Sequence, residues 1–500
     1  MLTYRVSKVH INEKHNLFLW CDLITSLGKN LYNASLFRQR QLLTSSRKND
    51  DELTDNEKEV IHEFVTALNL ENRNSIRYRP GWMKIEKVMK YHHNPDYYAK
   101  GLPRQSAQQI LKRSCDDMNS YFLAKAKWKK GNPVPKLPHY KKKNGRSSVL
   151  ITNQDCTISS DEEGNMYAGL PFAKDKLLKI GQARGRLKQA EVCPNNGSYV
   201  IYLTFEVEIP DKAITDSPLR IAAIDFGVEN IMAVVNNCGL PNLLYKGGII
   251  KSINQRYNKR IASIMKTEMS KPDCPKSRNG NAYFIPTEES RKITLYRNNS
   301  IHDLMHKISK HFIIWCKVNQ INTIVAGVNN GNKQEIQLGG VNNQNYVQIP
   351  FGYLRNCISY LSDENGIRYV EREESYTSKA SFLDGDYIPI YGTDDDMSKF
   401  SGKRAPTRYR GMYKKNGFRG LYKSSDDVII NSDLNGAANI LRKEYPEAFE
   451  LGAKPDFSSV IIIRHPDEEK IKENQMKQQY LNKKPSRSKL KRAKKKLKTD

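Results

Sequence analysis

The chain has 500 residues, and 82 lysines and arginines against 54 aspartates and glutamates give a formal net charge of +28 at pH 7. Its length is enough for about three domains. A hydrophobic content of 38% is too high for a disordered chain and too low for a membrane protein. The positive charge predicts a polyanionic partner, although a ribosome-associated protein, or a merely soluble basic one, has the same composition.

The cysteines and the first residues indicate a cytoplasmic protein. Eight cysteines are scattered between Cys21 and Cys357, and no two of them have the Cys-x-x-Cys spacing of a zinc or redox site. The first residues lack the apolar core of a signal peptide, and no apolar run is long enough to span a membrane. We expect free thiols, no membrane partner and, in a prokaryote, association with the nucleoid.

The first part of the chain changes its periodicity twice. Residues 1–16 alternate as a strand does, and residues 17–130 carry apolar residues at helical spacing, for example Val60, Phe64 and Leu68. A Gly- and Pro-rich stretch then breaks the helices, and strands return over 131–217. We therefore expect a β-rich module that is split by a helical insertion.

Basic and aromatic residues alternate in two places within this first part. Such mixtures can stack on bases while their charges follow the phosphates. The aromatic residues could equally be ordinary helix-packing groups, and both interpretations stay open. The candidate nucleic-acid-binding residues are Arg77, Tyr78, Arg79, Trp82, Lys141, Lys142 and Lys143.

The region from residue 218 onward predicts an α/β domain. An apolar strand ends in Asp225, a tight turn and a returning antiparallel strand follow, and two long helices come next. A buried strand over 323–328, a helix, a second strand over 367–374 and a helix that opens near Asp433 complete the series. This is the layout of an RNase H-like nuclease core.

Acidic residues at these positions suit phosphodiester cleavage. Two divalent ions that activate water and support the leaving oxygen need hard oxygen ligands. A carboxylate at the end of an apolar strand is costly unless something neutralises it. A metal ion at Asp225 is one solution, and an aspartate that caps the following turn is the other.

Four ordered motifs resemble those of TnpB, the insertion-sequence-encoded RNA-guided nucleases related to compact type V CRISPR effectors and to Fanzor. Residues 223–230 and 431–440 are similar to the first and third RuvC motifs, and residues 328–334 and 373–381 fit one TnpB branch. The resemblance implies that Asp225, Glu374 and Asp433 are catalytic and bind two Mg²⁺ ions, with Mn²⁺ as a substitute. It also implies a guide RNA and double-stranded target DNA as partners; protein partners remain unassigned.

The chain departs from most TnpB proteins at the second RuvC strand, where Gly327 stands in place of the catalytic glutamate. One interpretation is a protein without catalytic activity. The other is that Glu374, on the next strand, takes over, as in the TnpB branch with a rearranged glutamate; adjacent strands lie about 4.8 Å apart, so its carboxylate could reach the same ions. We favour Glu374, because Glu371 and Glu373 would face the opposite side of the sheet.

The second departure concerns zinc. No cysteine lies between Glu374 and Asp433, so a zinc ribbon is excluded and no zinc is expected. The segment 381–425 would instead be a metal-free substrate loop. His302 and His306 have metal-ligand spacing but are interpreted as a half-solvated helix face. Further nucleic-acid-binding candidates, which could also be structural, are Lys333, Gln334 and Lys379.

The resemblance and the periodicities together predict a multi-domain α+β fold. A β-barrel-like wedge domain over 1–16 and 131–217 would carry a helical recognition domain over 17–130. An RNase H-like (RuvC) nuclease domain with a mixed sheet would follow over 218–380 and 426–464, interrupted by the 381–425 insertion. Residues 465–500 form a basic tail, with ten lysines and arginines between 483 and 498, that could bind a polyanion or merely aid solubility.

The expected function is RNA-guided cleavage of target DNA by a transposable element, through two-metal hydrolysis. Two alternatives stay open: a guide-dependent DNA-binding protein without cleavage activity, and a transposase-associated strand-transfer protein. The sequence shows no context for a nucleophilic Tyr or Ser, which argues against strand transfer by a covalent intermediate.

Overall fold

The structure is a computed structural model that describes residues 2–174, 176–181, 185–208, 219–277, 279–329, 348–390, 400–404, 420–450 and 452–466. The chain divides into two compact units, Met1–Ile209 and Pro210–Asp500, called unit 1 and unit 2 below. Within the described ranges, every helix is too short or too polar to pass through a lipid bilayer.

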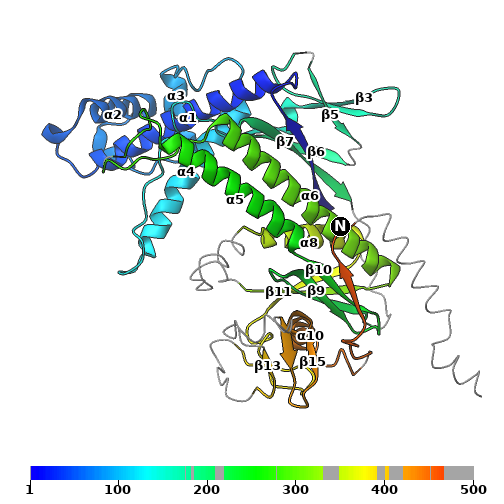
Figure 1. Cartoon of the computed structure of the whole chain (residues 1–500). Helices are drawn as coiled ribbons and strands as arrows, with labels where there is room; N and C mark the ends of the chain where they lie inside the picture. Colours follow the sequence, from blue (N-terminus) through cyan, green and yellow to red (C-terminus); the bar gives the residue numbers. More distant parts are fainter. Residues whose placement is uncertain are drawn as a thin grey trace, which may run out of the picture. The chain divides into compact units, whose positions relative to one another are not determined.

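Unit 1 begins with a strand, continues with helices and ends with a series of strands (Figure 1). The first strand and the helices are β1 (Leu2–Ile11), α1 (Phe18–Ser45), η1 (Asp50–Glu52), α2 (Asp55–Leu68), η2 (Arg73–Ser75), α3 (Trp82–Tyr91) and α4 (Arg104–Ala126). The later elements are β2 (Val149–Thr152), η3 (Asn153–Asp155), β3 (Thr157–Ser160), β4 (Met166–Gly169), β5 (Leu177–Gly181), β6 (Arg186–Asn195) and β7 (Ser198–Glu208).

The helices of unit 1 are inserted between two strands of the same sheet. The order of this sheet is β1-β7-β6-β2, and β1 pairs antiparallel with β7 along its whole length, from Leu2 opposite Glu208 to Ile11 opposite Tyr199. Strands β3, β4 and β5 form a separate sheet. One hydrophobic core joins the helices to both sheets, so the helical insertion and the strands form a single packed unit.

Unit 2 alternates strands and helices. Its elements up to residue 373 are β8 (Ile221–Asp225), β9 (Asn230–Asn236), β10 (Asn242–Lys246), α5 (Gly248–Met269), α6 (Glu288–Val318), β11 (Thr323–Val328), α8 (Phe351–Glu364) and β12 (Arg368–Glu373). The remaining ones are β13 (Lys403–Arg404), β14 (Leu421–Lys423), β15 (Ile429–Asn431), α10 (Ser432–Glu444) and β16 (Val460–Ile463).

The main sheet of unit 2 is mixed, with the order β12-β11-β8-β9-β10-β16. Strands β8, β11 and β12 are parallel to one another, and β9 is antiparallel to both β8 and β10. The carboxyl ends of β8, β11 and β12 therefore meet at one edge of the sheet. The expected multi-domain α+β fold with a mixed sheet is confirmed.

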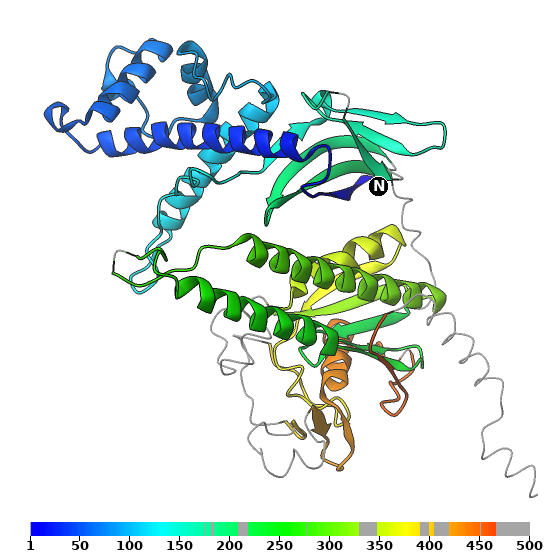
Figure 2. The same ribbon diagram turned by 45° about the horizontal axis from the view of Figure 1, so that its top comes forward.

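Helices cover both faces of this sheet, as Figure 2 shows. Residues of α5, α6 and α8 pack on one face with Ala222 and Ile224 of β8. Residues of α10 pack on the other face with Ile221 and Ala223. Side chains alternate between the two faces along a strand. The face on which each strand residue packs therefore indicates the face on which the residues at the end of that strand emerge.

Candidate active site

Asp225 ends β8 and faces α10. It follows Ala223 by two residues and so lies on the face that α10 covers. Its carboxylate touches the first turns of this helix: Oδ2 lies 2.5 Å from the point that a Cβ on Gly436 would occupy. Only a glycine at position 436 therefore leaves room for this carboxylate.

Asp433 is the second residue of α10 and lies beside the same place. The side chain of Asn431 caps the helix by accepting hydrogen bonds from the backbone N–H groups of Asp433 (2.9 Å) and Leu434 (3.2 Å). A negative charge in the first turn of a helix is stabilised by the helix dipole. The Asp433 carboxylate accepts a 2.7 Å hydrogen bond from Nδ2 of Asn230 and lies 3.5 Å from Nη2 of Arg404.

Glu374 follows β12 directly, and its carboxylate fills the space above Gly327. Gly327 pairs with Arg372, so Glu374, two residues further, emerges on the α10 face. Its Oε2 lies 2.9 Å from the point that a Cβ on Gly327 would occupy, and the carbonyl oxygen of Ile224 lies 3.3 Å from that same point. The carboxylate thus stands where a side chain of residue 327 would begin, next to the end of β8.

The three acids influence one another electrostatically. Burial, followed by the like charges of Asp433 and Glu374, raises the pKa of Asp225 well above its ordinary value, while Arg404 opposes the shift. Protein atoms surround the Asp225 carboxyl closely enough for burial to be the largest cause, although all three residues keep part of their surface accessible. A cation at this place would relieve the repulsion.

The donor set fits a divalent cation such as Mg²⁺, which prefers carboxylate oxygens. The oxygens are not, however, closed around one point: no three or more His, Cys, Asp or Glu side chains in the described part of the chain are arranged to hold an ion as they stand. Charge repulsion acts over longer distances than coordination, which needs oxygens about 2.1 Å from Mg²⁺. The side chains would therefore have to turn toward the ion.

The neighbouring glutamates on β12 are engaged elsewhere. Glu371 lies 3.6 Å from Arg355 of α8, on the opposite face of the sheet. The expectation that Glu373 faces the opposite side is wrong: at the end of β12 it accepts a hydrogen bond of 2.9 Å from Nζ of Lys443 on α10, and one of 2.7 Å from the backbone N–H of Ser375. Of the three glutamates, it is Glu374 that the structure brings to the end of β8, where Asp225 and Asp433 also lie.

The nucleic-acid candidates of unit 1 lie in two places. Arg77, Tyr78 and Arg79 are exposed, and the Arg79 guanidinium stacks 3.6 Å from the ring centre of Phe122. Trp82 is half-buried and packs against the hydrophobic core, which agrees with a packing role for this residue.

The three consecutive lysines lie on the extended segment before β2. Lys141, Lys142 and Lys143 are exposed, and their backbone is held to α1: Asn33 pairs with the backbone of Lys141, and Nζ of Lys29 donates to the carbonyl of Lys143. This anchoring leaves the Lys142 and Lys143 side chains on the surface. Nucleic-acid binding by these residues stays a prediction.

The remaining candidates have varied surroundings. In unit 2, Lys379 is exposed, its Nζ lies 5.7 Å from the ring centre of Tyr376, and Lys333 and Gln334 lie outside the described residues. His306 contacts the hydroxyl groups of Tyr353 (2.6 Å) and Tyr360 (3.1 Å), and His302 stacks on Tyr353, so these histidines pack against α8.

Two strands of the 381–425 segment, β13 and β14, form a small sheet with β15, which follows the segment, in the order β13-β14-β15. The two aspartates near its start stabilise the fold locally. Asp384 accepts hydrogen bonds from the backbone and hydroxyl of Ser425, and Asp386 accepts them from Ser381 and Ser401. Binding of substrate by this segment stays a prediction.

A groove of about 870 Å³ lies on the other side of unit 2, between α5 and α6. Its lining includes Arg256, Tyr257, Tyr296 and Arg297, and none of the three clustered carboxylates. The candidate active site is therefore a surface at the sheet edge, separate from this groove.

The sequence did not single out Asn230, Arg404 or Gly436 as site residues. Asn230 and Gly436 lie within the two motifs that carry Asp225 and Asp433, so their nearness to these acids along the chain was a signal that could have found them. Arg404 offered no such signal, because it comes from β13 and reaches Asp433 only through the fold.

Comparison with known proteins identifies relatives over part of the chain. Residues 204–333 match the family described as "Probable transposase" (OrfB_IS605). No curated protein matches the chain.

Several solved structures are similar at low identity. A cryo-EM structure of a Cas12f1–sgRNA–target DNA complex has 13% identity, with 84% of this chain and 82% of that chain covered and a TM-score of 0.46. A CRISPR-Cas12f ternary complex has 15% identity, coverage of 84% and 81%, and a TM-score of 0.32. Alicyclobacillus acidoterrestris C2c1 with single-guide RNA has 9% identity, coverage of 83% and 69%, and a TM-score of 0.29. The transposase match, which spans both Asp225 and Gly327, confirms the resemblance of this chain to the TnpB family.

Proposed function

We propose that the chain is an RNA-guided DNA endonuclease of the TnpB type, with Asp225, Glu374 and Asp433 as its catalytic carboxylates. One observation carries the proposal: three carboxylates that span 208 residues of sequence, those of Asp225, Glu374 and Asp433, come together around the end of β8. A cluster of like charges is costly without a counter-ion. A function that brings in divalent cations accounts for it.

The arrangement of unit 2 supports an RNase H-like (RuvC) domain. A carboxylate at the end of the first strand, an antiparallel second strand and a helix with an acidic first turn follow the expected layout. In this proposal unit 1 supplies the wedge and recognition domains, which would hold the guide RNA and its heteroduplex with DNA. The guide would read the target sequence by base pairing.

Each acid has a distinct part in the proposed site. Asp225, on the rigid end of a buried strand, would hold the ions together with Glu374 and Asp433. A bound pair of Mg²⁺ ions would supply an activated water and stabilise the charge on the leaving oxygen. Arg404, already 3.5 Å from Asp433, would lie close enough to contact a substrate phosphate.

Plasmid cleavage with the RNA that co-purifies with the protein tests this function. With Mg²⁺ the full chain should cut a plasmid that carries the guide-matched target, and EDTA should stop the cutting. We expect Asp225→Ala to lower the cleavage rate by about 100-fold or more, while guided binding to the target remains. Loss of binding together with cutting would mean that Asp225 only maintains the fold.

Variants of Glu374, which follows β12, and of Glu371, which lies on it, separate the proposal from its alternatives. Glu374→Ala should be as inactive as Asp225→Ala, whereas Glu371→Ala, on the opposite face, should cut normally. If the wild-type chain binds its guided target without cutting it, the protein is a guide-dependent binding protein. Joined strands among the products would instead favour strand transfer.

A further inference from the structure

The geometry points to Lys246 and Asn230 as positioning residues that fix the Asp433 carboxylate and thereby strengthen binding of a divalent cation at the proposed site. This inference rests on the proposed function, and it assigns a role to two residues that are themselves not ligands. They lie at the ends of adjacent strands, β9 and β10.

A shift in the pairing of β10 with β9, where Ile231 of β9 is skipped, brings Lys246 to Asn230. The pairing of β10 with β9 runs regularly from Leu243 to Tyr245, which lies opposite Met232, and then shifts so that Lys246 lies opposite Asn230. Such a bulge redirects a side chain out of the regular alternation. Nζ of Lys246 consequently lies 2.7 Å from Oδ1 of Asn230.

Gly247 stabilises this irregular end of β10. Its backbone N–H donates to the carbonyl of Glu229 at 2.9 Å, and a Cβ at this position would lie 2.4 Å from the carbonyl oxygen of Val228. The strand end can therefore approach the 227–230 turn this closely only with glycine at position 247.

Lys246 decides which way the Asn230 amide points. An ammonium group can only donate hydrogen bonds, so the atom of Asn230 that faces it must be the carbonyl oxygen. The amide nitrogen then necessarily faces Oδ2 of Asp433, at 2.7 Å. The chemistry of Lys246 thus turns Asn230 into a donor toward the carboxylate.

A donor at this place holds the carboxylate in one orientation. Asn230 is only 3% exposed, so its hydrogen bond to Asp433 is shielded from water and stronger than a surface one. The positive charge of Lys246 polarises the amide and increases its pull on Oδ2. With Oδ2 held, Oδ1 of Asp433 stays on the side of Arg404 and is available to a cation that displaces this contact.

Partners of this kind, one bond removed from the metal, commonly change metal affinity by about 10- to 100-fold. A purely structural role of Asn230 predicts a different effect of its replacement. Asn230 would then matter only because a buried amide needs partners, and its replacement would lower stability without a specific effect on cation binding.

Binding of Mn²⁺ alone to the full chain tests the inference without relying on cleavage. Free Mn²⁺ can be followed by electron paramagnetic resonance, and the melting temperature in EDTA reports folding. We expect Asn230→Leu to weaken Mn²⁺ binding by about 10- to 100-fold. Lys246→Met should also weaken Mn²⁺ binding. Lys246→Arg, which keeps a hydrogen-bond donor, should retain most of the wild-type affinity.

The double variant gives the sharpest result. If Lys246 acts through Asn230, the variant that combines Asn230→Leu with Lys246→Met should bind Mn²⁺ no more weakly than Asn230→Leu alone. Additive losses would overturn the relay. Should Asn230→Leu fail to fold, Lys246→Met decides the question, because Lys246 is partly exposed at a strand end and its removal leaves the core intact.

Asn236→Leu is the matched control. Asn236 is a buried asparagine at the other end of β9, where it donates to the carbonyl of Leu240. Its loss should lower the melting temperature and leave Mn²⁺ affinity unchanged. If Asn230→Leu behaves like this control, the inference is wrong, whereas unchanged Mn²⁺ binding in Asp225→Ala would instead refute the proposed metal site itself.

Discussion

Two glycines leave the space that the carboxylates of Asp225 and Glu374 occupy. A Cβ on Gly436 would lie 2.5 Å from Oδ2 of Asp225, and a Cβ on Gly327 would lie 2.9 Å from Oε2 of Glu374. Neither glycine has the positive backbone angle that glycine alone adopts easily. They are therefore required by packing against the acids, and their conformational freedom plays no part.

Gly436→Ala tests this packing argument. Alanine favours a helix by about 1 kcal/mol over glycine, but here the added methyl group would push Asp225 away from its place. We expect the cleavage rate to fall by about 10-fold or more. The melting temperature should change little, because the gain in helix propensity and the displacement of Asp225 oppose each other. Cleavage rates and thermal unfolding of the same preparation separate the two effects.

Gly352→Ala provides the control for this substitution. Gly352 also lies in a helix, α8, but a Cβ there would meet nothing within 4 Å. The variant should cut at the wild-type rate and be slightly more stable. Equal activity of both alanine variants would show that Asp225 does not need the space at position 436.

His311 links the stability of unit 2 to pH. It lies on α6, where its Nδ1 is 2.8 Å from the hydroxyl of buried Tyr245. Burial lowers the pKa of His311 to about 4, from an ordinary value of 6.5. The unfolded chain therefore takes up the proton first, and the contribution of neutral His311 to stability is fully present only above pH 6.5.

We expect His311→Gln to reduce this pH dependence. As the pH falls from 6.5 to about 4, protonation should cost the wild-type chain up to about 3 kcal/mol of folding free energy. Glutamine can still bond to Tyr245 but does not titrate. Denaturant unfolding at pH 7 and pH 4.5 should therefore show a smaller difference for the variant, and an equal difference would place the titration elsewhere.

The site residues differ in how far the sequence could predict them. Asp225 stands out because it ends an apolar strand, and Asp433 because it stands where a helix begins. Glu374 follows from alternation along its strand, and the structure brings it to the expected face. Lys246 could not be predicted, because its direction depends on a shift in the pairing of two strands, which no local pattern reports.

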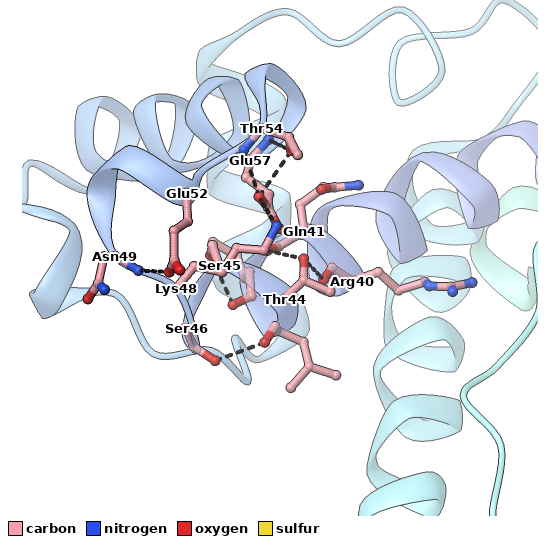
Figure 3. Close-up of polar contacts among 12 residues, drawn as sticks. Arg40, Gln41, Thr44, Ser45, Ser46, Lys48, Asn49, Glu52, Thr54 and Glu57 are labelled. Atoms are coloured by element: carbon pink, nitrogen blue, oxygen red, sulfur yellow. Dashed lines mark hydrogen bonds and ion pairs between the residues drawn. The ribbon is translucent and has the colours of Figure 1, made fainter.

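At the scale of elements, a buried glutamate joins α1 to α2 (Figure 3). Glu57 accepts hydrogen bonds from Nζ of Lys48 (2.7 and 2.9 Å) and from the backbone N–H and hydroxyl of Thr54 (2.9 and 3.0 Å). Burial alone would raise the pKa of Glu57, but these bonds and one from Thr44 lower it to about 2. The carboxylate both caps α2 and fixes the connection from α1.

Glu57→Gln should destabilise unit 1 at neutral pH. The pKa of Glu57 is lowered in the folded state, so its contribution is present above pH 4.5 and disappears as the pH falls toward 2. The Lys48 side chain is partly exposed, so solvent screens part of the interaction, and we expect a loss of about 1–2 kcal/mol. Denaturant unfolding at pH 7 measures the loss, and at pH 3 the variant and the wild type should differ less.

Glu52→Gln is the control for Glu57→Gln, and Figure 3 shows both residues. Glu52 accepts a 2.8 Å hydrogen bond from the backbone of Asn49 in a similar capping arrangement, but its side chain is exposed. Its replacement should cost no more than about 0.5 kcal/mol. Equal losses for the two variants would mean that burial and Lys48 add nothing to the cap.

Elements with strong local patterns were the ones that the sequence predicted. The apolar runs of β8, β9 and β11 and the spaced apolar residues of α6 all appear where expected. Strands β10 and β16 were not predicted. They are short, and β16 becomes a strand by pairing with β10, more than 200 residues earlier in the chain, so its partner is decided only by the fold.

At the scale of the whole molecule, the net charge of +28 follows directly from the sequence. The fold does not by itself explain why the chain carries this charge. Ten of the positive charges lie between residues 483 and 498, after the last described strand of unit 2 ends at Ile463. Among the described residues, the core of unit 2 extends to Ile463. We therefore expect that the charge of residues 483–498 can be removed without altering that core.

Removal of residues 467–500 should weaken binding to RNA of any sequence while the melting temperature stays the same. Each phosphate of a single strand that a basic residue neutralises contributes about 0.7 to the slope of log affinity against log salt concentration. If all ten charges contact RNA, the slope should become shallower by about 7. A full-length variant with these ten residues replaced by glutamine should match the truncation, because charge and not length is responsible. An unchanged slope in both variants would show that the polyanion binds to the folded units alone.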